Sequence, residues 1–255
     1  MVMYNVRPKK HLGQHFLIDV NIAKDTVEQI SGVENLLEIG PGMGILTREI
    51  LALNIPKFHV IEIDLQSIDY LNKHFPDLQA HIVHDDFLTF DTASLFGDAQ
   101  FSIVGNFPYN ISSQILFKVL ELKNRVTSLV GMFQKEVALR ICSPPGNKNY
   151  GILSVLMQAY YNTEYLFTVG SHVFNPPPKV QSAVVKFTRN GVEKLQCDEV
   201  LFKRIIKTGF NQRRKTLHNA LKTMELSTLP AKFESKRAEQ LSVGDFIEIT
   251  LLNQG

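Results

Sequence analysis

Short apolar runs alternate with amphipathic segments along the first part of the chain. Patterns typical of buried strands occur at residues 36–39, 58–63, 81–83, 101–104 and 126–133. The segments between them repeat apolar residues at helical spacing, beginning with residues 20–30. Asp19 can cap this first helix, and Ser112 or Ser113 can cap the helix after the fourth strand. Strands that alternate with helices predict an α/β fold with a parallel sheet covered on both faces.

The pattern changes near residue 165. Two strand-like runs, 165–169 and 183–188, are joined by a proline-rich loop, which predicts an antiparallel hairpin at one edge of the sheet. No strand pattern follows Asn190, and apolar residues then recur at helical spacing. One such helical face is formed by Val200, Leu201, Ile205 and Ile206. We therefore expect an α/β domain over residues 1–190 and a small all-helical domain over residues 191–255.

A glycine-rich loop, Glu38-Ile-Gly40-Pro-Gly42-Met-Gly44, follows the first strand of the sheet. Glycines let the backbone turn tightly and let a ligand lie against it. The spacing is Gly-x-Gly-x-Gly rather than the Gly-x-Gly-x-x-Gly of dinucleotide binding, which favours a methionine-linked nucleoside over NAD. Glu62 ends the second strand, where a carboxylate accepts both ribose hydroxyls, and Asp86 after the third strand can accept from an adenine amine. Turn glycines and loop acids without a ligand are the structural alternative.

A second motif, Asn106-Phe107-Pro108-Tyr109, ends the fourth strand. The exocyclic amine of adenine is a weak nucleophile because its lone pair is delocalised into the ring. Hydrogen bonds from the amine to the Asn106 amide oxygen and the Pro108 carbonyl favour a pyramidal nitrogen, and Tyr109 can stack on the base. Positioning then does most of the catalysis, and no strong general base is required. A strand-to-helix turn in which Asn bonds its own backbone is the alternative interpretation.

Two further features bear on the chemistry. Phe174 begins a rigid loop that continues to Val180, and it can form the second face of a sandwich around an extruded base. Core packing is the alternative role for this ring. His81 and His84 superficially resemble metal ligands, but their spacing puts them on opposite faces of a strand, so no metal is expected.

Taken together, these motifs resemble the KsgA/RsmA family of rRNA adenine dimethyltransferases. The similarity covers nearly the whole chain: residues 9–17, 38–44, 62–64, 106–109, 174–182, 210–217 and 237–242. The Gln-Arg-Arg-Lys-Thr-Leu block at 212–217 and the Pro-Lys-Val-x-Ser run at 178–182 are the most particular parts. They distinguish this family from the related macrolide-resistance methyltransferases that act on large-subunit rRNA.

The resemblance implies a Rossmann-like catalytic domain that takes S-adenosyl-L-methionine as methyl donor. It also implies methylation, twice each, of N6 of two adjacent adenosines in the 3′-terminal hairpin of 16S rRNA during 30S subunit biogenesis. The implied cofactor site consists of Gln14, His15, Leu17, Gly40, Gly42, Gly44, Glu62, Ile63, Asp86, Phe87 and Asn106. The implied catalytic residues are Asn106, Phe107, Pro108, Tyr109 and Phe174. Two positions depart from the family: many relatives have Asn at His15, and Leu or Ile is usual at Phe107.

Charge is distributed unevenly along the chain. Residues 180–255 hold 13 Lys and Arg against 8 Asp and Glu, whereas the rest of the chain is slightly acidic. A basic tail favours a polyanionic partner, and a solvated surface without a partner is the alternative. We expect one exposed helix face to contact rRNA phosphates through Lys203, Arg204, Lys207, Arg213, Arg214 and Lys215.

Composition favours a cytoplasmic protein. No apolar stretch approaches the ~20 residues of a membrane span, and no secretory signal is visible. Cys142 and Cys197 are far apart, which suggests no disulfide framework. We expect a bacterial monomer. Two rival functions stay open: a large-subunit rRNA adenine methyltransferase, against which the tail motif argues, and a non-catalytic RNA-binding assembly factor, against which the intact quartet at 106–109 argues.

Overall fold

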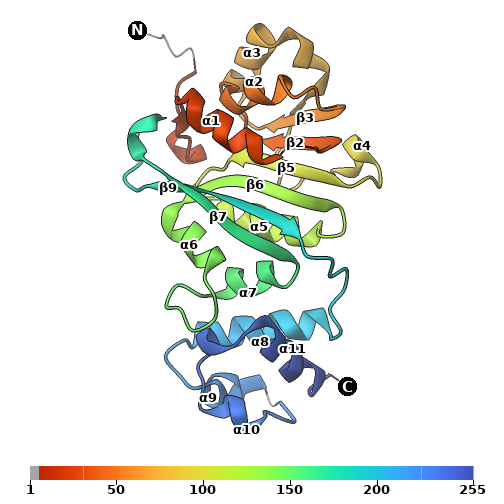
Figure 1. The fold of residues 1–255 in the computed structure, drawn as a ribbon, viewed down its shortest axis with the longest axis vertical. Helices are drawn as coiled ribbons and strands as arrows, with labels where there is room; N and C mark the ends of the chain where they lie inside the picture. Colours follow the sequence, from red (N-terminus) through yellow and green to blue (C-terminus); the bar gives the residue numbers. More distant parts are fainter. Residues whose placement is uncertain (1–5, 31, 225, 255) are drawn as a thin grey trace. The chain divides into compact units, whose positions relative to one another are not determined.

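The computed structural model describes residues 6–30, 32–224 and 226–254 (Figure 1). Its contacts divide the chain into two compact units. The first, here called the sheet unit, consists of the chain up to Ala138 together with Glu164–Arg189. The second, here called the helical unit, consists of Leu139–Thr163 and the chain from Asn190 onward. The segment 139–163 therefore packs with the C-terminal helices, so the compact units do not follow a single cut of the chain. The functional division at residue 190 stays a prediction.

A seven-stranded sheet has the order β4-β3-β2-β5-β6-β9-β7 (Figure 1). Its strands are β2 (Asn35–Ile39), β3 (Lys57–Glu62), β4 (Ile82–His84), β5 (Phe101–Asn106), β6 (Val126–Gln134), β7 (Tyr161–Val169) and β9 (Ser182–Arg189). Strands β2 to β6 pair in parallel, whereas β9 pairs antiparallel with β6. The predicted parallel sheet with a hairpin at one edge is therefore confirmed.

Helices cover both faces of this sheet. Successive residues in the central strands, such as Leu36 and Leu37 or Ile103 and Val104, are each 0% exposed. Because neighbouring side chains in a strand point to opposite faces, both faces must be covered. The helices are α1 (Val20–Val27), α2 (Ile45–Leu51), α3 (Leu65–His74), α4 (Ala93–Phe96), α5 (Ser112–Glu121) and α6 (Lys135–Cys142), with 3₁₀ turns η2 (Glu28–Ile30) and η3 (Pro76–His81).

Only one of the two predicted helix caps is present. Asp19 accepts hydrogen bonds from the backbone nitrogens of Asn21 and Ile22, as expected at the start of α1. The prediction that Ser112 or Ser113 caps α5 is wrong. Ile111 holds the cap position without a side-chain bond, and Ser112 is already the first helical residue. The turn that ends the quartet runs directly into the helix, because the Ile111 nitrogen donates to the Pro108 carbonyl.

A small ladder joins the N-terminal segment to the loop after β7. Strand β1 (Phe16–Leu17) pairs antiparallel with β8 (Phe174–Asn175), so that Leu17 lies opposite Phe174. Short 3₁₀ turns precede both strands: η1 (Lys10–Leu12) and η4 (Ser171–Val173). Strands of two residues carry no periodic pattern, which is why the sequence did not predict them.

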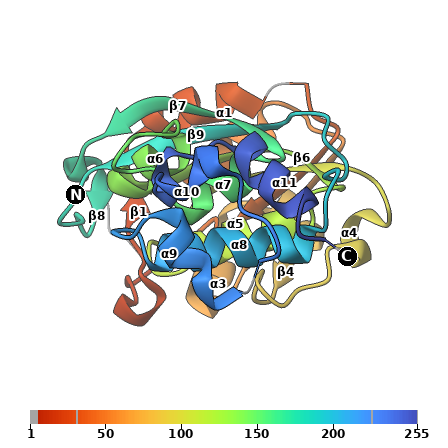
Figure 2. The ribbon, with the colours of Figure 1, turned by 90° about the horizontal axis from the view of Figure 1, so that it is seen from below.

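The helical unit contains α7 (Ile152–Gln158), α8 (Glu199–Asn211), α9 (Leu217–Leu221), α10 (Ala231–Glu234) and α11 (Val243–Leu251), with 3₁₀ turns η5 (Lys222–Met224) and η6 (Ala238–Gln240) (Figure 2). Helix α8 buries Phe202, Ile205 and Ile206. Val200 is 78% exposed, so the prediction that it shares one face with Ile205 and Ile206 was wrong. It lies instead on the face of α8 that carries Lys203, Arg204 and Lys207. In the described ranges, no helix is both long and apolar enough to cross a membrane.

Candidate active site

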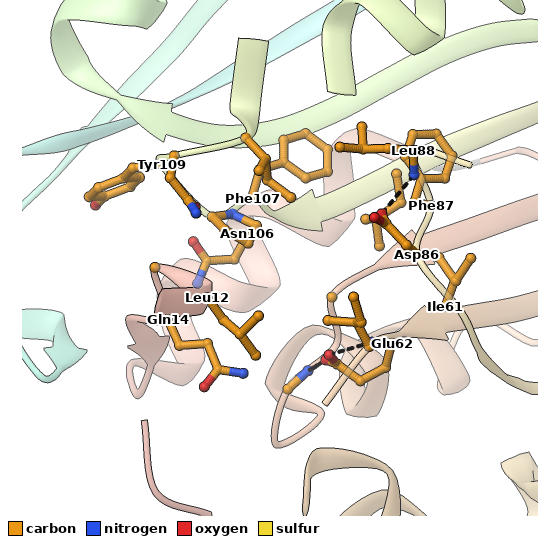
Figure 3. A pocket seen from close by; sticks show the side chains of 18 of the residues that line it. Leu12, Gln14, Ile61, Glu62, Asp86, Phe87, Leu88, Asn106, Phe107 and Tyr109 are labelled. Carbon is orange, nitrogen blue, oxygen red and sulfur yellow. Dashed lines mark hydrogen bonds between the residues drawn. The ribbon is translucent and has the colours of Figure 1, made fainter. Parts of the chain in front are cut away.

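A cavity of about 290 Å³ opens where β2, β3, β4 and β5 end (Figure 3). Its wall is formed by the glycine loop, by Glu62 and Ile63, by residues 85–88, by residues 106–111 and by the N-terminal segment 11–16. Ligands of open α/β sheets bind outside the carboxyl ends of the strands. The two motifs singled out in the sequence therefore meet at one cavity in the sheet unit.

The three loop glycines have different roles. All have left-handed backbone angles, with φ of +66° at Gly40, +56° at Gly42 and +75° at Gly44. A side chain at Gly40 would meet no atom within 4 Å, so this glycine leaves open space beside the cavity. A Cβ at Gly42 would lie 2.8 Å from the Phe16 ring, and one at Gly44 would lie 2.5 Å from the Phe75 ring. Gly40 and Gly42 line the cavity, whereas Gly44 makes room for packing.

Glu62 binds the protein's own backbone. Its Oε1 accepts from the nitrogens of Ile63 at 2.8 Å and Asp64 at 2.9 Å, and its Oε2 accepts from the Gly42 nitrogen at 3.1 Å. Burial raises the pKa of Glu62, and these three bonds oppose the rise. A carboxylate offers about four acceptor positions. One position therefore remains on Oε2 for a ribose hydroxyl, and acceptance of both ribose hydroxyls by Glu62 stays a prediction.

The remaining wall at this end of the cavity combines apolar and acidic groups. Ile63 is 48% exposed despite its apolar side chain, and Phe87 is buried beneath the cavity surface. Asp86 is half-buried, and its Oδ1 accepts from the Leu88 nitrogen at 2.9 Å (Figure 3). This bond holds the Asp86 carboxylate just after the end of β4. Its contact with an adenine amine stays a prediction.

The N-terminal segment 9–17, here called the strap, is tied to the start of α3. Lys9 Nζ forms an ion pair with Asp64 Oδ1, and Gln14 Nε2 donates to Asp64 Oδ2 at 3.2 Å. Gln14 Oε1 in turn accepts from the Lys9 backbone nitrogen at 2.8 Å. Burial alone would raise the pKa of Asp64, but the hydrogen bonds from Lys9, Gln14, the Gln66 backbone and Ser67 together outweigh it, so that this pKa lies below its ordinary value. The sequence predicted no role for Asp64; its place two residues after Glu62 was the available signal.

Asn106 ties the strap to the quartet. Its Nδ2 donates to the His15 carbonyl oxygen at 2.9 Å. A carbonyl can only accept, so this contact determines which end of the amide is nitrogen. The Asn106 oxygen is thereby left as an acceptor on a residue that borders the cavity. Asn110 adds a weaker bond of the same kind, from its Nδ2 to the His11 carbonyl at 3.4 Å.

Tyr109 is held at both ends of its side chain. Its hydroxyl lies 2.6 Å from Ser182 Oγ, and its ring stacks with the His15 imidazole at a centroid distance of 5.3 Å. His15 Nδ1 donates to the Pro176 carbonyl at 2.8 Å, which fixes the imidazole as well. Burial raises the pKa of Tyr109, so the phenol stays neutral. Ser182 is 0% exposed and was not predicted as a site residue, although it ends the Pro-Lys-Val-x-Ser run.

Phe174 and Leu17 lie in the core and not in the cavity wall. They are 2% and 3% exposed, and they face each other across the β1–β8 ladder. Both pack into the cluster that contains α1 and the glycine-loop side of the sheet. In this arrangement the Phe174 ring cannot reach a base, and the core-packing alternative describes it. Stacking by Phe174 stays a prediction that requires the loop to open.

The predicted RNA-binding residues lie in the helical unit, but not all on one helix. Lys203, Arg204 and Lys207 share a solvent-facing stripe of α8, which ends at Asn211. The expectation that residues 213–215 continue this helix was wrong, because the chain turns after Gln212. Arg213 Nε pairs with Glu239 Oε2 at 2.6 Å, and its NH2 group bonds the Lys148 carbonyl. Arg214 and Lys215 are exposed in the turn.

The fold of the chain is shared with solved methyltransferase structures. A dimethyladenosine transferase from Plasmodium falciparum has a TM-score of 0.77 at 24% identity, over 93% of this chain and 96% of that one. The 23S rRNA methyltransferase ErmE has a TM-score of 0.67 at 22% identity, over 92% and 99% of the two chains. These likenesses show that the chain has the Rossmann-like fold of the two methyltransferase structures.

Sequence similarity narrows the class further. Residues 5–253 match the family model of ribosomal RNA adenine dimethylase. The Ribosomal RNA small subunit methyltransferase A of Parabacteroides distasonis is 52% identical over 98% of this chain and 95% of its own. The protein of the same name from Cytophaga hutchinsonii is 51% identical over 99% and 100%. The chain belongs to the ribosomal RNA adenine dimethylase family.

Glu38, the first residue of the glycine loop, is a buried acid to which the sequence assigned no role of its own. Glu38 is 1% exposed, and its Oε2 accepts from Thr47 Oγ1 at 2.7 Å. Burial raises its pKa to about 8; the Thr47 bond opposes this, and the Glu62 charge adds to it. Between the ordinary pKa of 4.5 and about 8, the folded state keeps a proton that the unfolded state releases. This group therefore lowers stability as pH rises through that window.

We expect Glu38→Gln to increase the free energy of unfolding relative to the wild type in a pH-dependent way. The gain is small near pH 5, grows up to about pH 8 and is constant above it, because Gln keeps the acceptor for Thr47 and carries no charge. Denaturant titrations across this range measure it. Glu34→Gln, an exposed glutamate beside the same strand, is the matched control. A gain that does not vary with pH would show that Glu38 titrates as an ordinary glutamate.

Proposed function

We propose that this chain transfers methyl groups from S-adenosyl-L-methionine to N6 of adenosine in small-subunit rRNA. The observation that carries the proposal is the oriented Asn106 amide, whose oxygen is left as an acceptor at the cavity that the glycine loop also lines. The names of the relatives from Parabacteroides distasonis and Cytophaga hutchinsonii support the choice of small-subunit RNA.

The cavity fits a methionine-linked nucleoside. Gly40 leaves open space along the loop, and the exposed Ile63 offers an apolar surface for a purine. The remaining acceptor position on Glu62 Oε2 suits a ribose hydroxyl, and Asp86 suits the adenine amine. When bound there, the sulfonium compound supplies an electrophilic methyl group. These contacts support cofactor roles for Gly40, Gly42, Glu62, Ile63, Asp86 and Phe87. Gln14 and His15 line the cavity and support it indirectly, Gln14 through its bond to Asp64 and His15 through its stacking on Tyr109.

The chain's own residues prepare the amine. Asn106 Oδ1 and the Pro108 carbonyl each accept a hydrogen bond from one N–H of the amine, which turns the nitrogen lone pair out of the ring plane. The Tyr109 ring, held by His15 and Ser182, supports the base face. N6 then bonds to the methyl carbon as the carbon–sulfur bond breaks, and N6 releases one proton to solvent. After the first methylation N6 carries one N–H. In the second methylation it therefore donates to only one of the two acceptor oxygens.

The finer features of the proposal follow from the family resemblance. We infer that the substrates are two adjacent adenosines in the 3′-terminal hairpin, each methylated twice, and that the reaction accompanies 30S assembly in the cytoplasm. The protein acts as a monomer in this proposal. The basic residues of α8 and of the turn after it supply the RNA contacts, because exposed cations bind phosphates without base preference.

Mapping the methylated nucleotide tests this function. Purified protein is incubated with labelled S-adenosylmethionine and with unmodified small or large subunits, and the modified nucleosides are identified by mass spectrometry. Dimethyladenosine at two adjacent positions near the 3′ end of small-subunit rRNA is the expected product. Label only in large-subunit rRNA would establish the rival methyltransferase, and binding without transfer would establish an assembly factor.

Asn106→Ala is expected to slow methyl transfer by about 100-fold or more, the cost of losing the geometry of a reacting group. Single-turnover assays on unmodified small subunits measure the rate, and thermal unfolding together with subunit binding checks that the fold and RNA binding are retained. Asn110→Ala is the matched control, because it removes the weaker strap bond and leaves the quartet amide in place. Equal, small effects of both substitutions would mean that Asn106 serves only the turn.

The exposed cations are expected to set the salt dependence of subunit binding. Each phosphate contact adds a slope of about −0.7 to −0.9 to log affinity against log salt. A triple variant, Arg204→Gln, Arg214→Gln and Lys215→Gln, should weaken binding and flatten this slope by about 2–3. Arg213 is left unchanged because Glu239 already binds it. Lys24→Gln with Lys73→Gln, exposed positions of the sheet unit, is the control. An unaltered slope in the triple variant would rule out this surface.

A further inference from the structure

Two glycines lie side by side where the central strands approach the cavity. Gly105 of β5 pairs with Gly131 of β6 in the parallel register. Neither has the left-handed backbone that favours glycine, so conformation does not require this residue at either position. Space does require it, because a side chain at either position would overlap its neighbours.

The ring of Phe107 occupies the space above both glycines. A Cβ built on Gly131 would lie 2.2 Å from Phe107 Cε2 and 2.9 Å from Cδ2. A Cβ built on Gly105 would lie 2.7 Å from Cε1 and 3.0 Å from Cδ1 of the same ring. The two glycines thus meet opposite edges of one ring, which spans both strands.

The position of this ring sets the position of the quartet. Phe107 is 1% exposed and borders the cavity (Figure 3). Its ring meets the Phe133 ring edge to face at a centroid distance of 5.2 Å. Its backbone nitrogen donates to the Met132 carbonyl at 3.3 Å. Asn106 and Pro108 are its covalent neighbours and carry the two acceptors for the adenine amine. A ring lifted from the sheet would therefore move both acceptors.

We propose that Gly131 is a positioning residue for methyl transfer. Gly131 and Gly105 together leave a surface without side chains, and the Phe107 ring packs against it. This packing fixes the distance of Asn106 and Pro108 from the sheet, and therefore the positions of their two acceptor oxygens. This inference rests on the proposed function, since it names what positions the same site. Gly131 touches neither the base nor the methyl donor and acts through Phe107 alone.

The two glycines provide a matched pair of tests. A methyl group at Gly131 meets only aromatic side chains among its nearest neighbours, Phe107 and Phe133. A methyl group at Gly105 also meets the Ile39 carbonyl oxygen at 2.6 Å, which is backbone. Shortening Phe107 to Leu therefore relieves Gly131→Ala and does not relieve Gly105→Ala.

The experiment compares the wild type with Phe107→Leu, Gly131→Ala, Gly105→Ala and the two double variants. Single-turnover transfer to unmodified small subunits, cofactor affinity and thermal unfolding are measured for each. We expect Gly131→Ala to slow transfer by about 10- to 100-fold, the scale of a displacement near 1 Å. The cofactor affinity of Gly131→Ala should stay within about threefold of the wild type. The transfer rate of the double variant Gly131→Ala, Phe107→Leu should stay within about threefold of that of Phe107→Leu alone. Gly105→Ala should not be rescued.

Three results would overturn the proposal: transfer by Gly131→Ala at the wild-type rate, a loss that only follows the unfolded fraction, or no rescue by Phe107→Leu. If Gly131→Ala does not fold, the double variant decides, because a double variant that also fails to fold shows that Phe107 is not the obstacle. Absence of transfer by the wild type would refute the proposed function instead. Cofactor affinity and unfolding of the same set would still report whether the ring and Gly131 are coupled.

Discussion

The hydrogen bond from the Asn106 side chain to the His15 carbonyl oxygen is the contact on which the proposed chemistry depends. It determines which atom of the amide remains for a substrate. It also requires the strap to be in place, and the strap is held by the Lys9–Asp64 ion pair at one end and by the β1–β8 ladder at the other. The strap, whose His15 lies 91 residues before Asn106 in the sequence, thereby orients the Asn106 amide at the end of β5.

Charge explains how one cavity can suit both reactants. Glu62 is buried and accepts from the backbone nitrogens of Gly42, Ile63 and Asp64, while Glu38, at the start of the glycine loop, has a raised pKa. Asp64 is compensated by Lys9. Glu62 therefore holds the backbone on both sides of the cavity, and one of its acceptor positions remains for a ribose hydroxyl. The amine end of the cavity carries neutral acceptors, which suits a reaction that needs geometry rather than a base.

The parts of the fold that could be predicted from sequence are those with strong local patterns. Apolar runs such as 101–104 and the loop glycines point to strand ends, and strand ends share one edge of a parallel sheet. Tertiary pairing decided the rest. Phe174 reads as a base-stacking ring in sequence, yet the ladder opposite Leu17 turns it into the core. Arg213 reads as a phosphate ligand, yet Glu239, 26 residues later, binds it. The Phe107 ring is accommodated by Gly131, 24 residues later, a match that no single motif contains.

The most direct test of the account is a structure of the protein with S-adenosylhomocysteine and adenosine. We expect the nucleoside part of the product beside Gly40 and Glu62, and the adenosine amine within about 2.7–3.2 Å of Asn106 Oδ1 and of the Pro108 carbonyl oxygen. The Asn106 nitrogen should still face His15. An amide turned so that its nitrogen meets the base, or an adenosine bound away from the quartet, would contradict the central claim that the strap orients Asn106 to accept from N6.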